Sequence, residues 1–308
     1  MLPARWADPA PAPVRGARPG HPGGSARTVR GHRGVRPRRY RLAVLIATWN
    51  INSIRARVDR AVAFLQRTGV DVLALQETKV KDEAFPREPF EALGYEVATH
   101  GFSQWNGVAV LSRVGLEDVE RGFPGQPTWG DPGVAEARAL GATCGGVRVW
   151  SLYVPNGREI GDPHYTYKLD WLSALRDAAG GWLDADPLAQ VAMVGDWNIA
   201  PLDTDVWDIG WFAGRTHVTP AERDAFEEIA KAGYTEVSRV HLPAERTFTY
   251  WDYQQLRFPR NEGMRIDFTW ASPALAVRVT GVEIDRNERK GKGASDHVPV
   301  ILDVADAA

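Results

Sequence analysis

Residues 191–201 constrain the fold of this chain more than any other stretch, because an apolar segment runs directly into polar side chains. The first four residues, Val-Ala-Met-Val, predict a buried β-strand. Gly195 is predicted to let the backbone turn sharply where this strand ends. Asp196 and Asn198 follow two residues apart, and in an extended chain this spacing places both side chains on one face. The pattern fits either a strand followed by a plain Asx turn or a site at the end of a strand.

The composition is that of a globular protein. The chain has 308 residues, of which 44% are hydrophobic, so it can bury a core in one large domain or two small ones. Twelve tryptophans suit a layered core and also suit stacking on bases or sugars. The single cysteine, Cys144, excludes an intrachain disulfide and fits a reducing compartment. No apolar run is long enough to cross a bilayer, so we expect a soluble, cytoplasmic protein without a membrane partner.

Charge is distributed unevenly along the chain. Residues 1–40 contain nine Arg and one Asp, so the rest of the chain carries a net charge of about −10 although the whole chain carries −2. Residues 1–41 are rich in Arg, Pro and Gly and lack periodic apolar residues, which predicts a disordered leader. Residues 42–308 are predicted to form a single domain. Because this domain is acidic, it would need local Arg and Lys side chains, and a cation among its carboxylates, to bind a polyanion.

Hydrophobic periodicity predicts an α/β (α+β) chain in which strands outnumber helices. Thr219 and Glu222 match a capping box, with Pro220 in the first turn, and predict a helix that runs to Gly233. The other predicted helices are 58–67 and 165–179. The predicted strands are 42–48, 70–75, 107–111, 147–154, 191–194, 265–270, 277–284 and 298–304.

Several loops between these elements combine aromatic and basic side chains, as the grooves of nucleic-acid-binding proteins do. The alternative is that these loops only pack over the edge of a sheet. The candidate groove residues are Trp105, Tyr165, Tyr167, Lys168, Trp207, Trp211, Arg215, Tyr250, Trp251, Tyr253, Arg257, Phe258 and Arg260.

Polar side chains also mark the ends of six predicted strands, where a rigid scaffold meets adaptable loops. Each is weak evidence alone, but together they offer oxygen ligands and one imidazole without cysteine, which suits Mg²⁺ or Mn²⁺ rather than structural zinc. Such a set could serve the attack of water on a phosphodiester, which needs a base, a cation and donors to the phosphate oxygens. The residues are Asn50, Glu77, Tyr153, Asn156, Asp196, Asn198, Asp267, Asp296 and His297.

A series of motifs is similar, in order and spacing, to the bacterial exonuclease III family of the endonuclease/exonuclease/phosphatase superfamily. The motifs are TWNINSIRAR, LQETK, NGVAVLS, YVPNG followed by YKLDWL, GDWNIAP, TYWDYQ, GMRIDF and SDHVPV. The resemblance covers about residues 46–303. It implies a four-layered αββα sandwich, with residues 42–308 as one catalytic domain, and a monomer is expected.

The resemblance also implies roles for individual residues. Asp196 would activate the water, Asn198 would hold the scissile phosphate and orient Asp196, and Tyr153 would contact that phosphate or assist the leaving group. His297, paired with Asp267, would polarise the phosphate. Whether Asp196 or His297 is the base, and whether one or two metals act, stays open. The residues implied around the metal are Asn50, Glu77, Asp196, Asn198, Asp296 and His297.

Members of this family cut duplex DNA 5′ to abasic sites, digest it from 3′ to 5′ and remove 3′-phosphates. The resemblance therefore implies Mg²⁺ as the cofactor, replaceable by Mn²⁺, and double-stranded DNA with abasic sites or 3′ ends as the substrate. Abasic selectivity is expected from a small apolar pocket that a full nucleotide would overfill. Met264 stands where some relatives have tryptophan, which leaves the shape of this pocket open. The candidate substrate-binding residues are Trp105, Asn106, Asn156, Tyr250, Trp251, Met264 and Ile266.

Two other functions compete with this interpretation. One is a superfamily phosphatase or phosphodiesterase acting on a non-DNA phosphoester such as an inositol phosphate. The other is a catalytically silent DNA-binding relative, which the presence of Glu77, Asp196 and His297 argues against.

Overall fold

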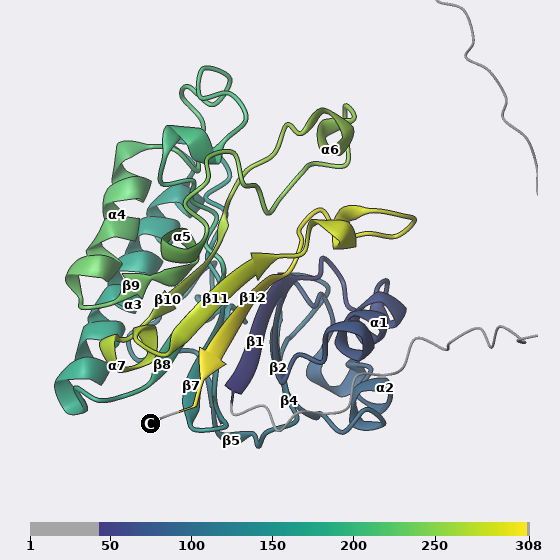
Figure 1. Ribbon diagram of the computed structural model, residues 1–308. Coiled ribbons are helices and arrows are strands. Elements are labelled where there is room, and N and C mark those ends of the chain that lie inside the picture. The colour runs from purple at the N-terminus through teal and green to yellow at the C-terminus, as the bar shows by residue number, and fades with distance from the viewer. Residues whose placement is uncertain (1–42, 307–308) are drawn as a thin grey trace, which may run out of the picture. The chain divides into compact units, whose positions relative to one another are not determined.

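The computed structural model describes residues 43–306, and their strands form two six-stranded sheets (Figure 1). The predicted leader, 1–41, lies outside the described residues. The first sheet has the strand order β11 (Val279–Ile284), β12 (Val300–Ala305), β1 (Ala43–Asn50), β2 (Val72–Gln76), β4 (Val108–Ser112) and β3 (Glu96–His100). The second has the order β5 (Glu117–Arg121), β6 (Ala139–Cys144), β7 (Val147–Tyr153), β8 (Val191–Asp196), β10 (Asp267–Ala271) and β9 (Thr235–Glu236).

Each sheet contains one central parallel pair, β1 with β2 and β7 with β8, and its other neighbouring strands are antiparallel. Because the carboxyl ends of parallel strands lie at the same edge, Asn50 pairs with Gln76 and Tyr153 pairs with Asp196. Asp267, the first residue of the antiparallel β10, also pairs with Asp196. The sheets thereby bring polar side chains to strand ends that lie side by side.

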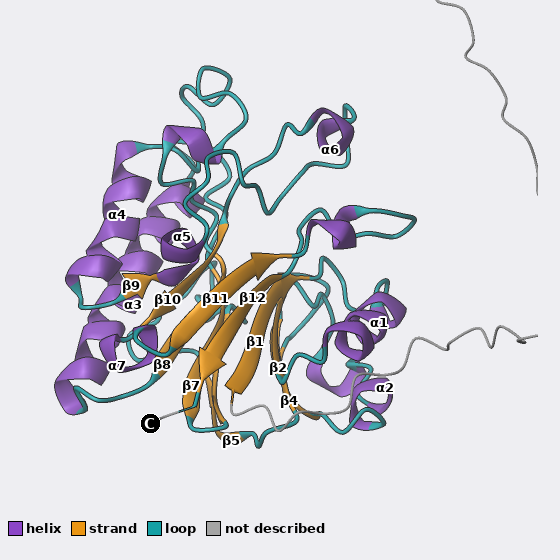
Figure 2. Ribbon diagram, in the orientation of Figure 1, coloured by secondary structure: helices purple, strands orange, loops and turns teal. Residues whose placement is uncertain are grey.

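Helices cover the outer faces of both sheets (Figure 2). Those beside the first sheet are α1 (Val58–Thr68) and α2 (Glu88–Glu91), and the two longest helices beside the second sheet are α3 (Pro163–Ala185) and α4 (Pro220–Lys231). The described residues therefore form the predicted four-layered αββα sandwich. The short helices α5 (Val237–His241), α6 (Arg257–Arg260) and α7 (Pro273–Ala276) lie in the connections of the second half.

Alternation along β1 illustrates why the layers form. Leu45, Ala47 and Trp49 belong to the apolar cluster that contains Phe64 of α1, and the Trp49 and Phe64 ring centroids lie 5.4 Å apart. Ile46 faces the other way, into a cluster built from side chains of both sheets. Since successive side chains of a strand point to opposite faces, a strand with apolar residues on both faces, as β1 has, is buried on both sides.

Two predicted helices show how local signals set helix limits. The capping box before α4 is confirmed: Glu222 N donates to Thr219 Oγ1 at 3.2 Å, and Thr219 N donates to Glu222 Oε2 at 3.1 Å. Helix α3 is longer than predicted at both ends. Asp162 caps its start by accepting from His164 N at 2.7 Å, and its last turns pass through two glycines and place Trp182 against Trp150, with ring centroids 4.9 Å apart.

Strands β3, β5, β6 and β9 were not predicted. β5 is exposed along its whole length and carries four charged residues among five, so it lacks the apolar alternation of a strand. It forms only because β6 offers an edge with which it can pair. β6 is buried but contains alanine, glycine and threonine, whose small side chains give little periodic signal.

Candidate active site

Three side chains from separate strand ends converge in the described structure. Glu77 follows β2, Asp196 ends β8 and His297 precedes β12, and one ligand atom from each lies within 4.8 Å of the other two. Asn50, the buried last residue of β1, joins two of them. Its Nδ2 donates to Glu77 Oε1 at 2.8 Å and to Asp196 Oδ2 at 2.9 Å. A single carboxamide therefore holds both carboxylates in place.

The backbone around Asp196 depends on Gly195. This glycine lies inside β8 with a φ of +154°, and a Cβ there would lie 1.9 Å from the carbonyl oxygen of Leu152 on β7. The predicted sharp turn at Gly195 is wrong, because the strand continues to Asp196. Glycine is needed instead for the close approach of β7 and β8, which fixes the position of Asp196.

His297 is held by the carboxylate of Asp267, which lies on the side of the imidazole ring that faces away from Asp196. Its Nδ1 lies 2.9 Å from Asp267 Oδ2 and 3.1 Å from Asp267 Oδ1, whereas its Nε2 lies 3.7 Å from Asp196 Oδ2. The Trp49 indole donates to the backbone oxygen of His297 at 3.2 Å. The imidazole is thus oriented by Asp267 and presents Nε2 toward the Asp196 side of the cluster.

The burial of these groups shifts their pKa values. Burial alone would lower the pKa of His297, but the carboxylates of Asp267 and Asp196 outweigh it and raise this pKa to about 10. Burial raises the pKa of Asp196 to about 7, aided by Asp267 and Glu77 and opposed by His297. Burial also acts to raise the pKa of Glu77, yet this pKa is lowered because Lys79 Nζ lies 2.6 Å from its Oε2. Several acidic groups thus share one buried volume, which favours a bound cation.

The donor set fits a divalent metal ion. Glu77 and Asp196 supply carboxylate oxygens, which suit Mg²⁺ or Mn²⁺, whereas His297, whose raised pKa keeps Nε2 protonated, lies beside them as a hydrogen-bond donor. Asp296 lies outside this group of three. Its Oδ1 accepts from Asn52 Nδ2 at 3.0 Å, so its implied place near the metal stays a prediction.

Asn198 forms the next part of the site. Its backbone N–H donates to Asp196 Oδ1 at 3.0 Å, and its φ is +51°, so an Asx turn follows the strand. The predicted extended geometry, with both side chains on one face, is therefore wrong at this position. The turn and the site coexist, since the turn fixes the Asp196 carboxylate while Asn198 Oδ1 accepts from Asn156 Nδ2 at 3.2 Å.

Tyr153, at the end of β7, lies beside the same cluster. The guanidinium carbon of Arg138 lies 4.8 Å from the centroid of its ring, and Arg138 in turn forms an ion pair of 2.6 Å with Glu136. Burial raises the pKa of Tyr153 well above its ordinary value, so its phenol keeps a proton that it can donate.

A buried ion pair supports this part of the site and was not predicted. Lys168 Nζ lies 2.5 Å from Glu222 Oε1 and donates to the backbone oxygen of Asn198 at 2.6 Å, and both charged side chains are completely buried. The prediction that Lys168 lines a groove is wrong. Lys168 lies three residues before Trp171 and seven before Leu175, a spacing that puts all three side chains on the same face of α3. This spacing is the sequence signal from which its burial could have been predicted.

His217 is a second residue that the sequence did not single out. It is buried, and its Nε2 lies 3.2 Å from both Asn198 Oδ1 and Asn156 Nδ2. Burial lowers the pKa of His217 to about 4, so its imidazole is neutral at pH 7. Only the folded chain brings it to Asn198, because the intervening loop carries no recognisable motif.

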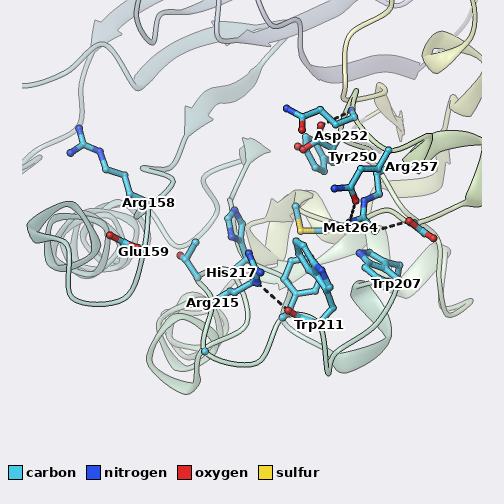
Figure 3. Close-up of a pocket in the computed structure, with 16 residues that line it drawn as sticks. Arg158, Glu159, Trp207, Trp211, Arg215, His217, Tyr250, Asp252, Arg257 and Met264 are labelled. Atoms are coloured by element: carbon cyan, nitrogen blue, oxygen red, sulfur yellow. Dashed lines mark hydrogen bonds and ion pairs between the residues drawn. The ribbon is translucent and has the colours of Figure 1, made fainter.

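Figure 3 shows the residues that line a cavity of about 550 Å³, and one part of this cavity adjoins the cluster of Glu77, Asp196 and His297. His217, Tyr250 and Met264 line the part next to it, and the ring centroids of Tyr250 and His297 are 4.9 Å apart. Tyr250 and Met264 therefore line a cavity beside the cluster, and their contact with substrate stays a prediction. The expectation that this pocket is small and apolar is wrong, because the cavity is large and three arginines also line it.

The remaining candidate substrate residues occupy different surroundings. Trp105 is 68% exposed, and Asn106 Nδ2 donates to Glu136 Oε1 at 2.8 Å. In contrast, Trp251 and Ile266 are only 1% and 2% exposed, and both are enclosed in apolar clusters. Their packing supports the loops around the cavity and leaves little surface for a direct contact with substrate, whereas contacts by Trp105 and Asn106 stay predictions.

The fold and the site define the class of protein. Residues 47–297 match the model of the Endonuclease/Exonuclease/phosphatase family, and the chain belongs to that family. Within this superfamily it is 32% identical over 266 residues to exodeoxyribonuclease III of Haemophilus influenzae, a match that covers 82% of this chain and 97% of the relative. The chain is thus a member of the exonuclease III/AP endonuclease family, whose enzymes are phosphodiester hydrolases.

Solved structures agree with this assignment. An AP endonuclease from Archaeoglobus fulgidus is 33% identical, with a TM-score of 0.79 over 86% of this chain and all of that one. A 3′ phosphatase from Neisseria, bound to a product DNA hairpin, is 32% identical, with a TM-score of 0.80 over 85% of this chain and 99% of that one. Among the described residues, no helix has the length and apolar character needed to span a bilayer.

Proposed function

We propose that this protein is a Mg²⁺-dependent DNA-repair nuclease that cuts duplex DNA 5′ to abasic sites and digests it from the 3′ end. Removal of 3′-phosphates is a further activity of the same site in this proposal. The observation that carries it is the convergence of Asn50, Glu77, Asp196, Asp267 and His297 from separate strand ends. The relatives whose names describe exodeoxyribonuclease, AP endonuclease and 3′ phosphatase activities support the choice of DNA as substrate.

Each residue has a role that its contacts support. Glu77 would hold the metal, with Asn50 fixing its carboxylate, and Mg²⁺ would supply positive charge to the phosphate oxygens. Asp196, fixed by Asn50 and by the Asx turn, orients the attacking water. His297, oriented by Asp267, donates from Nε2 to a non-bridging phosphate oxygen.

Two other side chains act on the phosphate and the leaving group. Asn198, whose Nδ2 donates one hydrogen to the backbone oxygen of Val154, has a second Nδ2 hydrogen that can be donated to a phosphate oxygen. The protonated phenol of Tyr153 assists departure of the 3′-oxygen. An abasic sugar turned out of the helix enters the cavity beside Tyr250 and Met264.

The test uses a labelled duplex that carries an abasic-site analogue and, on a separate duplex, an intact recessed 3′ end. With Mg²⁺ we expect incision 5′ to the analogue and shortening of the recessed strand, and with a chelator neither product. Asp196→Asn should reduce both rates by about 10²–10⁴-fold, the usual contribution of a positioned proton-transfer group. Asp177→Asn, an exposed position on α3, is the matched control and should react like the unmodified protein. Full activity of Asp196→Asn, or no product with either Mg²⁺ or Mn²⁺, would overturn the proposal.

Neither competing function is favoured by an observation of this structure. A silent DNA-binding protein needs no oriented imidazole and carboxylates in one cluster, and these are present. An inositol phosphate phosphatase would be identified by release of inorganic phosphate when an inositol phosphate replaces the DNA duplex under the same conditions.

A further inference from the structure

Part of the cavity wall consists of indole and guanidinium groups that lie against one another (Figure 3). The ring centroids of Trp207 and Trp211 are 5.7 Å apart. The guanidinium carbon of Arg215 lies 4.0 Å from the Trp211 centroid, and that of Arg257 lies 4.6 Å from Trp207 and 5.1 Å from Trp211. We call these four residues the stacking wall.

The stacking wall is fixed by its own contacts. Arg257 forms an ion pair of 2.6 Å with Glu262, and Arg215 Nε donates to the backbone oxygen of Trp211 at 3.0 Å. Within residues 43–306, no carboxylate lies within 4.0 Å of the Arg215 guanidinium, so its charge is not neutralised by an ion pair. Trp211 remains 40% exposed although it lines a cavity. The wall thus presents planar, partly cationic groups to whatever enters.

A sugar without a base would use little of this space. Next to Tyr250 and Met264 it would leave the stacking wall without a contact, since a deoxyribose has no planar face. A cavity of about 550 Å³ lies within the range that encloses drug-sized ligands, about 300–1,000 Å³. The volume and the wall therefore suit a larger substrate group than an abasic sugar.

Resting on the nuclease function above, we propose that this cavity receives a complete nucleotide, with its base on the stacking wall and its sugar beside Tyr250 and Met264. Bases that leave the helix stack on aromatic side chains and on guanidinium planes. Every base has such a face, so the site accepts intact and damaged bases alike. Arg215 adds positive charge near a bound phosphate or an electron-rich base edge.

The reaction that this site serves is the removal of a base-carrying nucleotide from a 3′ end. Water adds to the phosphorus of the terminal phosphodiester, and the bond from phosphorus to the 3′-oxygen of the preceding nucleotide breaks. The 3′-oxygen takes a proton, so the products are a shortened strand with a 3′-hydroxyl and a 5′-mononucleotide. No reactant other than water is needed.

The test compares two rates for one variant: incision at the abasic analogue, where no base can stack, and removal of a matched 3′-terminal nucleotide. Since base stacking on an aromatic ring is worth about 5- to 150-fold per base, Trp211→Ala should lower the ratio of nucleotide removal to abasic incision at least fivefold. Trp211→Phe keeps a ring and should restore most of that ratio. Leu188→Ala, an exposed apolar side chain outside the cavity lining, is the control and should leave the ratio unaltered.

A binding measurement separates this inference from the proposed function. In chelator, 2′-deoxyadenosine 5′-monophosphate should bind more tightly than 2-deoxyribose 5-phosphate to the unmodified protein, measured by calorimetry, and Trp211→Ala should remove the difference. Equal affinities, or equal losses of both rates in Trp211→Ala, would overturn the nucleotide site while leaving the nuclease intact. Tight binding of the nucleotide without any cleavage of DNA would instead overturn the proposed function.

Discussion

Replacing Lys168 by methionine should destabilise the protein more than any other single change at a lysine on α3 or α4, because its Nζ neutralises Glu222 where neither side chain reaches water. The variant leaves a buried carboxylate without its cation and frees the backbone oxygens of Asn156 and Asn198. Breaking a buried pair from one side costs about 3–5 kcal/mol of unfolding free energy.

The pKa of Glu222 gives a second estimate of the unfolding free energy that Lys168→Met should lose. Burial acts to raise it, but Lys168, the Thr216 hydroxyl and the His217 amide outweigh burial and lower this pKa from 4.5 to about 2. A shift of that size corresponds to about 3 kcal/mol, since one pKa unit is about 1.4 kcal/mol. For a domain of this size each kcal/mol moves the melting temperature by about 2–4 °C, so Lys168→Met should lower it by about 6–20 °C.

The assay is thermal and urea unfolding followed by circular dichroism, with Arg176→Met as the matched control. Arg176 lies on the same helix and forms an exposed ion pair of 2.6 Å with Asp177, a kind of pair worth at most about 1 kcal/mol. A second variant, Lys168→Met with Glu222→Gln, removes both charges but keeps a side-chain acceptor for Thr216 and His217, and it should recover part of the lost stability. A loss in Lys168→Met no larger than in Arg176→Met would refute the reasoning.

Three further predictions concern the site and its support. His297→Ala should reduce turnover on an abasic duplex by about 10²–10⁴-fold, because its loss removes a phosphate donor; normal turnover would contradict the role given to it. Glu77→Gln should weaken Mn²⁺ binding, measured by calorimetry or electron paramagnetic resonance, because it removes a charged ligand; unchanged affinity would place the ion elsewhere. Glu222, whose folded pKa is depressed, contributes stability that is fully present above about pH 4.5 and is lost as the pH falls through about 2. Glu222→Gln should therefore flatten the fall in unfolding free energy over this pH range, and a profile parallel to that of the unmodified protein would show that another carboxylate is responsible.

The amino-acid sequence by itself determined most of the strands and the positions where polar side chains gather, whereas the four-layered arrangement was implied by the family resemblance of its motifs. Apolar alternation predicted most of the strands, the Thr219–Glu222 capping box predicted α4, and the polar ends of strands predicted Asn50, Glu77, Asp196 and His297 as one set. These features depend on local patterns with a period of two or 3.6 residues, or on residues next to one another, so they can be read without coordinates. The edge strand β5 could not, because it forms only through its partner.

Only the tertiary structure decided which distant side chains meet. It buried Lys168 against Glu222, brought His217 to Asn198, and built the stacking wall from loops around Trp211 and Arg257. It also showed that Gly195 is needed where two strands approach closely. These contacts join residues that are far apart in the chain, and their side chains carry no mark of the partner until packing of the sheets and helices fixes their separation.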